Sequence, residues 1–158
     1  MPRLYNARMN SPNYKQPVSV LVLIHTPDLQ VLLLERTDFA DAWQCVTGSR
    51  EGSEQLAETA RREAGEETGL GRHEGKLRDW AYCSDFEIYE RWRHRYAPGV
   101  TTNTEHVFSI EVAAPYVPQL SEREHRRFRW VPWQQAAEMV FSPSNAEAIR
   151  MLPQRLAS

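Results

Sequence analysis

Residues 48–70 read "GSREGSEQLAETARREAGEETGL" and combine a helical pattern with six glutamates. Ser53 has N-cap chemistry, residues 54–68 have helical spacing, and Gly69 stands where a left-handed residue ends a helix. The apolar stripe of this predicted helix consists of Leu56, Ala57, Ala60 and Ala64. The pattern predicts a helix that packs one face against a core and carries many carboxylates on the other.

Three of these glutamates crowd one face of the predicted helix. Glu63, Glu66 and Glu67 stand at i, i+3 and i+4, and each like-charged pair costs roughly 0.2–0.5 kcal/mol. Gly65 costs about 1 kcal/mol more than alanine would. A bound cation explains both costs, and Mg²⁺ fits best because it takes oxygen ligands together with substrate phosphates. The alternative is a solvated helix face laced by Glu–Arg ion pairs.

The spacing of the charged residues resembles the signature of the Nudix family of hydrolases. Gly48 is followed after five residues by Glu54, after seven more by Arg62-Glu63, and then by Glu66-Glu67 and Gly69. One position departs from the family pattern, because Ala64 stands where a larger aliphatic residue is usual. The family cleaves nucleoside diphosphates linked to another moiety, so the resemblance implies a hydrolase of the same chemical class.

The resemblance also implies a set of metal ligands. Glu63 and Glu67 would be the main ligands, with Glu66 beside them and the Gly48 carbonyl contributing. Arg62 would orient the glutamates by hydrogen bonding. The expected cofactor is Mg²⁺, for which Mn²⁺ can substitute, and its expected role is to activate a water that attacks the substrate's phosphate chain.

A further carboxylate lies outside this signature, in "EHRRFRW" (124–130). Related enzymes often place an acidic residue here, so Glu124 is expected as an additional ligand or a general base. The alternative is an ordinary surface glutamate in a charged run. The catalytic candidates are therefore Arg62, Glu66, Glu67 and Glu124.

The rest of the chain predicts an α/β fold of α+β-like character, a mixed β-sheet sandwiched between α-helices. Strands are expected at 18–24, 31–36, 43–48, 77–90, 104–113 and 127–131, with later helices at 132–139 and 144–152. Residues 1–14 have the composition of a flexible polar arm, and residues 15–158 are expected to form a single Nudix domain.

Arginines and aromatic residues are interleaved in "ERWRHRYAPGVTTNTEHVF" (90–108). Arg93 and Arg95 can recognise phosphate oxygens, and the aromatics can stack on a heterocycle. A basic surface hairpin is the alternative, and a single-stranded nucleic-acid platform is disfavoured because the segment is short.

The similarity extends beyond the signature, from about Tyr14 to Ile149. "YKQPVSVLVLI", "AWQCVTGS", "FEIY" and "RHRYAPGVTTNTE" resemble a bacterial branch of the family that hydrolyses dihydroneopterin triphosphate to the monophosphate and pyrophosphate. One alternative is an enzyme that hydrolyses dATP or oxidised nucleotides in the nucleotide pool. Another is a binding module of the same fold that has no catalytic activity. The substrate-binding residues expected on this model are Lys15, Arg36, Thr47, Phe86, Glu87, Ile88, Tyr89, Arg93, Arg95 and Ser142.

Bulk properties limit the partners. The chain has 158 residues, 41% hydrophobic and 25% charged, with a net charge of −2, so no global attraction to nucleic acid or anionic membranes is expected. Its longest apolar run, 18–24, is too short to span a membrane. Cys45 and Cys83 have no metal-type spacing, which favours a reduced, cytoplasmic protein acting on a small-molecule triphosphate. The sequence does not specify an oligomeric state.

Overall fold

The computed structural model describes residues 13–157, so most of the expected polar arm lies outside the described residues. One mixed sheet organises this part of the chain. Its strands are β1 (Val18–His25), β2 (Gln30–Arg36), β3 (Trp43–Gln44), β4 (Val46–Ser49), β5 (Lys76–Glu87), β6 (Thr102–Glu111) and β7 (His125–Pro132). Its helices are α2 (Leu56–Thr68), α3 (Trp133–Met139) and α4 (Pro143–Ala157), with a short 3-10 helix η1 (Glu90–Arg95).

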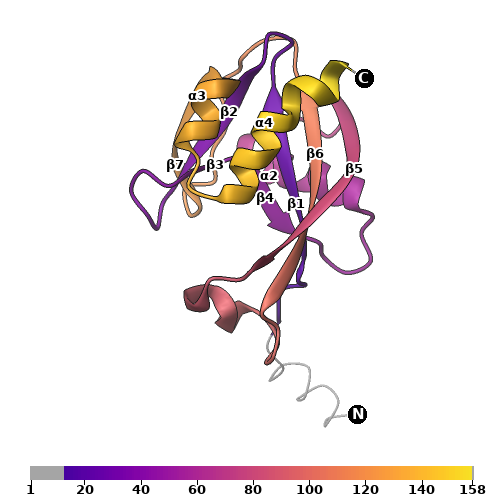
Figure 1. Ribbon diagram of the computed structural model, residues 1–158, viewed down its shortest axis with the longest axis vertical. Helices are drawn as coiled ribbons and strands as arrows, with labels where there is room; N and C mark the ends of the chain where they lie inside the picture. Colours follow the sequence, from indigo (N-terminus) through magenta and orange to yellow (C-terminus); the bar gives the residue numbers. More distant parts are fainter. Residues whose placement is uncertain (1–12, 158) are drawn as a thin grey trace.

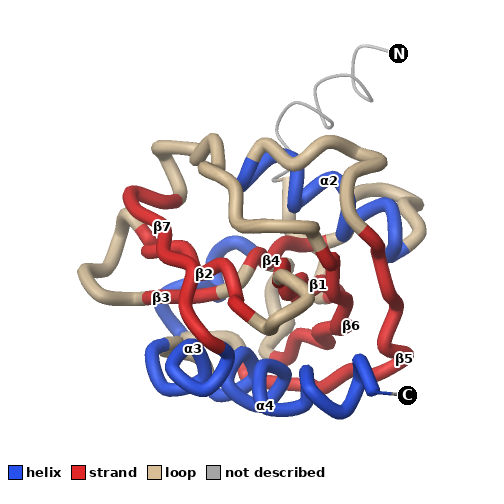
Figure 2. Tube along the Cα trace, turned by 90° about the horizontal axis from the view of Figure 1, so that it is seen from above, coloured by secondary structure: helices blue, strands red, loops and turns tan. Residues whose placement is uncertain are grey.

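The sheet has the strand order β3-β2-β1-β6-β5, with β4 paired to β1 and β7 paired to β2. The pair β1–β6 is parallel and the other pairs are antiparallel. Helix α2 covers one face and helices α3 and α4 cover the other, as Figure 2 shows. The predicted mixed sheet between helices is therefore confirmed.

Burial on both faces explains the uninterrupted apolar run in β1. Leu21 and Leu23 pack in the cluster that contains Ile149 of α4, whereas Val20 and Val22 pack in the cluster that contains Ala60 of α2. Successive strand residues point to opposite faces, so a strand covered on both sides needs apolar residues at every position. Strand β1 thus holds the two layers together.

Several element boundaries differ from the sequence expectations. The expected strand 43–48 is two short strands, because β3 pairs with β2 and β4 pairs with β1. Helix α2 begins after Gln55 rather than Ser53, and its first turn is closed by Glu58, which accepts a hydrogen bond from the Gln55 amide. Helix α4 begins at Pro143 and continues to Ala157, beyond the expected end at 152.

The basic segment is the helical turn η1 rather than a plain hairpin. Strands β5 and β6 reach beyond the covering helices, and Figure 1 shows the segment that joins them at the far end of the molecule. Within residues 13–157, no helix is long and apolar enough to cross a membrane.

An ion pair to a buried carboxylate anchors the start of β7. Glu35 of β2 is almost fully buried, and its two carboxylate oxygens accept hydrogen bonds of 2.7 and 2.9 Å from the exposed Arg127 guanidinium. The Asp41 amide donates to the same carboxylate at 2.8 Å. These contacts lower the pKa of Glu35 to about 2, chiefly through Arg127. They hold the start of β7, with His125 and the preceding Glu124, against β2.

Candidate active site

Arg62 connects helix α2 to the loop that precedes it. Its guanidinium donates to both Glu54 carboxylate oxygens at 2.8 and 3.0 Å and to the Ser49 carbonyl at 2.9 Å. On the helix itself it donates to Glu63 at 2.8 Å and to Glu66 at 3.2 Å. The position suits the orienting role expected of Arg62, because one guanidinium fixes several carboxylates at once.

Glu63 lies directly beneath Gly48 of β4. A Cβ atom built on Gly48 would lie 2.0 Å from Glu63 Cδ, so the buried carboxylate occupies the space that any side chain would need. Glycine at this position is therefore a requirement for close approach between β4 and α2. The contact brings the Gly48 backbone and the Glu63 carboxylate together.

Glu67 is the most buried of the helix carboxylates, with 1% of its surface exposed. Its Oε1 atom has no hydrogen-bond partner. Burial raises the pKa of Glu67 well above its usual range, and the neighbouring Glu63 raises it further. The pKa of Glu63 is also raised, mainly by burial. The two carboxylates therefore favour a bound proton or a bound cation over two unshielded negative charges.

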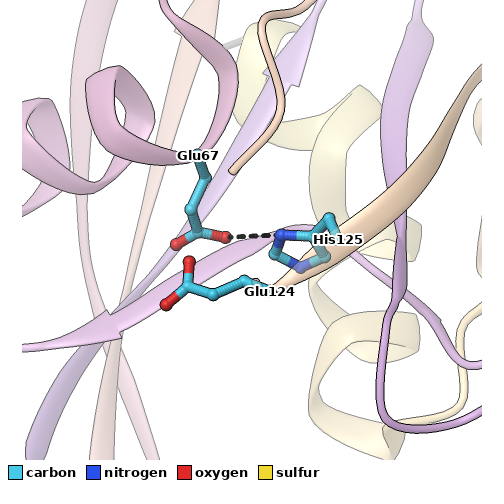
Figure 3. A group of neighbouring side chains, drawn as sticks. All are labelled: Glu67, Glu124 and His125. Atoms are coloured by element: carbon cyan, nitrogen blue, oxygen red, sulfur yellow. Dashed lines mark ion pairs between the residues drawn. The ribbon is translucent and has the colours of Figure 1, made fainter. Parts of the chain in front are cut away.

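Glu124 and His125 meet Glu67 from the opposite side (Figure 3). One ligand atom from each of Glu67, Glu124 and His125 lies within 4.8 Å of the others. His125 Nδ1 is 3.7 Å from Glu67 Oε1, and neither atom has a hydrogen-bond partner in the part of the chain that the structure describes. Sequence reasoning identified Glu124 but missed His125, which showed no spacing relation to the helix glutamates.

A hydrogen-bond chain fixes the orientation of His125. Its Nε2 atom lies 2.9 Å from the Gln44 side-chain nitrogen, which is a donor, so Nε2 accepts and the neutral ring carries its proton on Nδ1. The Arg36 guanidinium in turn donates to Gln44 at 3.4 Å. Burial, followed by Arg36, lowers the pKa of His125 to about 4, so the ring is neutral near pH 7.

These groups suit a divalent cation. Among the described residues the buried Glu67 Oε1 atom has no hydrogen-bond partner, and the carboxylate of Glu124 lies beside it. Glu63 adjoins this cluster through its contact with Glu67, whereas Glu66 is exposed and faces Arg62. The expected ligand roles of Gly48, Glu63, Glu66, Glu67 and Glu124 stay predictions.

The acidic cluster opens into a cavity of about 590 Å³. The cavity lining includes Glu67, Glu124 and His125 at one part and residues of β5, β6 and the α4 N-terminus at another. Most of the expected substrate-binding residues line it, namely Lys15, Arg36, Thr47, Phe86, Glu87, Ile88, Tyr89, Arg95 and Ser142.

Cationic side chains at the cavity differ in how far their charge is compensated. Arg36 forms a two-point ion pair with Asp38 and stacks on Trp92. Burial lowers the pKa of Lys15, and Arg95 lowers it further, while Glu63 and Glu124 act in the opposite direction. Lys15 and Arg95 thus lie near each other and within the influence of the carboxylates.

Arg93 does not line the cavity. Its guanidinium is tied to the end of β5, where it donates to the Glu87 carboxylate and to the Ile88 carbonyl. The sequence predicts phosphate binding by both Arg93 and Arg95, but the structure places these two arginines in different surroundings. Arg95 faces the cavity and Arg93 braces η1 against β5.

Comparisons with known proteins agree with this architecture. A family model described as the NUDIX domain matches residues 15–152. The chain is 44% identical over 140 residues to a dihydroneopterin triphosphate diphosphatase of Haemophilus influenzae, covering 87% of each chain. It is 42% identical over 144 residues to the Escherichia coli K12 protein of the same name, covering 89% of this chain and 95% of that one.

The fold is also similar to solved structures. The E. coli dihydroneopterin triphosphate pyrophosphohydrolase matches with a TM-score of 0.81 and 40% identity, covering 87% of this chain and 95% of that chain. A NUDIX hydrolase of Listeria monocytogenes matches with a TM-score of 0.75 and 31% identity, covering 90% and 95%. An Ap4A hydrolase of Caenorhabditis elegans, at 17% identity, TM-score 0.69 and coverage of 89% and 97%, shares the fold.

Replacing Glu67 by glutamine tests the acidic cluster. Glu67→Gln keeps the side-chain shape and removes a charge that is buried beside Glu63. We expect unchanged or higher stability to urea in EDTA, because the repulsion disappears, together with loss of the stabilisation that Mg²⁺ or Mn²⁺ gives the parent protein. Activity should fall by several orders of magnitude, roughly 10³-fold or more.

The matched control is Glu58→Gln, which changes an exposed glutamate in the first turn of the same helix. It should retain both the cation-dependent stabilisation and the activity. A folded Glu67→Gln protein with parental cation stabilisation and near-parental turnover would remove Glu67 from the metal site.

Proposed function

We propose that this chain, which belongs to the Nudix hydrolase family, is a Mg²⁺-dependent enzyme that hydrolyses dihydroneopterin triphosphate to dihydroneopterin monophosphate and pyrophosphate. The observation that carries the proposal is that the acidic cluster and the polar–aromatic cavity are one continuous space. Similarity to two proteins named for this activity supports it, since it covers most of each chain.

The carboxylates would hold the cation, and His125 would lie beside them. A bound divalent cation neutralises phosphate oxygens and makes an attacking water more acidic. Glu67 and Glu124 supply oxygen ligands beside His125, whose proton points towards Glu67. Glu63 lies between Gly48 and Glu67, and Arg62 fixes Glu63 and Glu66 by hydrogen bonds. Hydrolysis of this kind needs positioning and charge stabilisation above all.

The phosphate chain would lie between the acidic cluster and the cationic wall. Lys15 and Arg95 carry donors on the cavity lining, and Thr47 lies next to Gly48 on the same lining. A charged donor stabilises an anionic phosphate oxygen more strongly than a neutral one does. Arg36 acts more as a brace, because Asp38 already neutralises it and Gln44 connects it to His125.

Product analysis with a panel of triphosphates tests the proposal. Dihydroneopterin triphosphate, dATP, GTP and 8-oxo-dGTP are each incubated with the protein and Mg²⁺. We expect kcat/KM to be highest for the pterin, and the products to be its monophosphate and pyrophosphate. The cavity residues outside the acidic cluster would contact the ring and therefore determine this preference.

EDTA should abolish every activity in the panel. Orthophosphate as the first product would contradict the proposal. A clear preference for dATP or for the oxidised nucleotide would assign the chain to the alternative role in cleaning the nucleotide pool.

The two arginines of η1 provide an internal comparison. Arg95→Ala removes a cation from the cavity lining, so we expect KM to rise about ten- to a hundredfold, as for the loss of one charge-assisted contact. Arg93→Ala removes the brace to Glu87 instead, so it should lower thermal stability more than it changes KM. Equal effects of the two variants on KM would show that Arg95 has no special contact with phosphate.

A further inference from the structure

Two buried hydrogen-bond acceptors on β6 lack partners. Glu105 is 3% exposed, and its Oε1 atom has no hydrogen-bond partner among residues 13–157. Asn103 is 2% exposed, and its Oδ1 atom has none among these residues either. The two residues are separated by one position on a strand, so their side chains lie on the same face of the sheet. Both line the cavity that also contains Glu67 and Glu124.

The remaining polar atoms of this pair are already engaged. The Asn103 side-chain nitrogen donates to the Ser19 hydroxyl of β1 at 2.7 Å, which fixes the amide and leaves its oxygen unpaired. The Ser144 hydroxyl, at the start of α4, interacts with the Glu105 carboxylate. Burial raises the pKa of Glu105, and Ser144 offsets this only in part. Buried polar atoms are normally paired, so two unpaired acceptors in one cavity point to a ligand that brings donors.

An aromatic side chain borders the two acceptors. Phe86 of β5 is the cross-strand partner of Asn103, so both side chains stand on the same face. Phe86 lines the cavity yet remains 37% exposed, which is high for a phenylalanine within a sheet. A flat heterocycle that stacked on this ring would present its edge to Asn103 and Glu105.

We propose that Glu105 and Asn103 form the ring-binding end of the site and select a heterocycle that carries a lactam N–H beside an exocyclic amino group. This proposal rests on the proposed function, and it names the residues that would recognise the ring of the substrate. The unpaired oxygen of Glu105 and the unpaired oxygen of Asn103 offer two acceptors to two adjacent N–H groups.

The same chemistry rejects adenine. Adenine has an amino group beside a ring nitrogen that is an acceptor, so one of the two unpaired oxygens would face a lone pair instead of a second donor. The rejected ligand would leave buried acceptors unpaired, which is the strongest source of discrimination available to a polar pocket. Dihydropterin and guanine share the accepted edge, so the proposal places them together and sets adenine apart.

Metal-free binding measurements isolate this subsite from the chemistry. We would titrate the parent protein and Glu105→Gln with dihydroneopterin monophosphate, GMP and AMP in EDTA, by fluorescence or calorimetry. Glutamine keeps the shape but turns one acceptor into a donor. We expect affinity for the pterin and guanine ligands to fall about ten- to a hundredfold, and affinity for AMP to change less than about threefold.

Two controls separate ring recognition from general electrostatics. Glu111→Gln changes a glutamate at the outer end of the same strand and should bind all three ligands as the parent does. Inorganic triphosphate with Mg²⁺ carries no ring, so Glu105→Gln should bind it as tightly as the parent or more tightly. Thermal stability of Glu105→Gln should be unchanged or higher, because a buried charge is removed.

Asn103→Ala keeps the carboxylate and removes the second acceptor, so it should lose roughly three- to tenfold in pterin and GMP affinity. This variant tests the subsite independently if Glu105→Gln does not fold. Tighter parental binding of one of the two accepted ligands identifies the natural ring.

The inference is overturned if the parent binds AMP as tightly as both other ligands, or if Glu105→Gln keeps the parental preference. It is also overturned if that variant loses as much affinity for inorganic triphosphate as it loses for the pterin ligand. Failure of the proposed function would show separately, as absence of pyrophosphate release from the pterin triphosphate by a parent protein that still binds the ring.

Discussion

The buried contact between Glu63 and Glu67 is the constraint on which the site depends. Two carboxylates one helical turn apart repel each other, and burial makes their charges costlier still. The fold tolerates them because Arg62 fixes Glu63 from one side and the bare backbone of Gly48 leaves room above it. Within the described residues, Glu124 and His125 then complete the cluster from β7, which Glu35 and Arg127 anchor.

The cavity is divided by charge and hydrogen-bonding character. Carboxylates and His125 form the acidic part, Lys15 and Arg95 provide cations on the same lining, and Glu105 and Asn103 present bare acceptors elsewhere on it. A molecule with a phosphate chain and a donor-rich ring complements all three parts. The groups that would hold the cation and those that would face the ring come from different elements. The residues around the ring can therefore set substrate specificity while the catalytic groups stay the same.

The sequence predicted the elements whose signals are local. The apolar stripe and Gly69 predict helix α2, and an uninterrupted apolar run predicts strand β1. The signature likewise groups Gly48 and Glu63 in one expected site. Such features depend on spacing within about twenty residues, which a single sequence displays directly.

The missed features depend on contacts between distant parts of the chain. His125 is oriented by Gln44, which is 81 positions away, and Asn103 is held by Ser19, which is 84 positions away. Glu105 occurs in a polar stretch, which is typical of a surface residue. It is nevertheless buried in the structure, because β6 pairs in parallel with β1. Arg93 and Arg95 look equivalent in the sequence, and only the turn of η1 directs one to the cavity and the other to Glu87.

Proton release on cation binding tests the central claim most directly. If a divalent cation displaces protons from Glu63 and Glu67, whose pKa values are both raised by burial, Mn²⁺ binding should release protons, and its apparent affinity should rise with pH. Calorimetry in buffers of different ionisation enthalpy measures both quantities. A cation affinity that does not vary with pH, with no proton released on binding, would contradict the account.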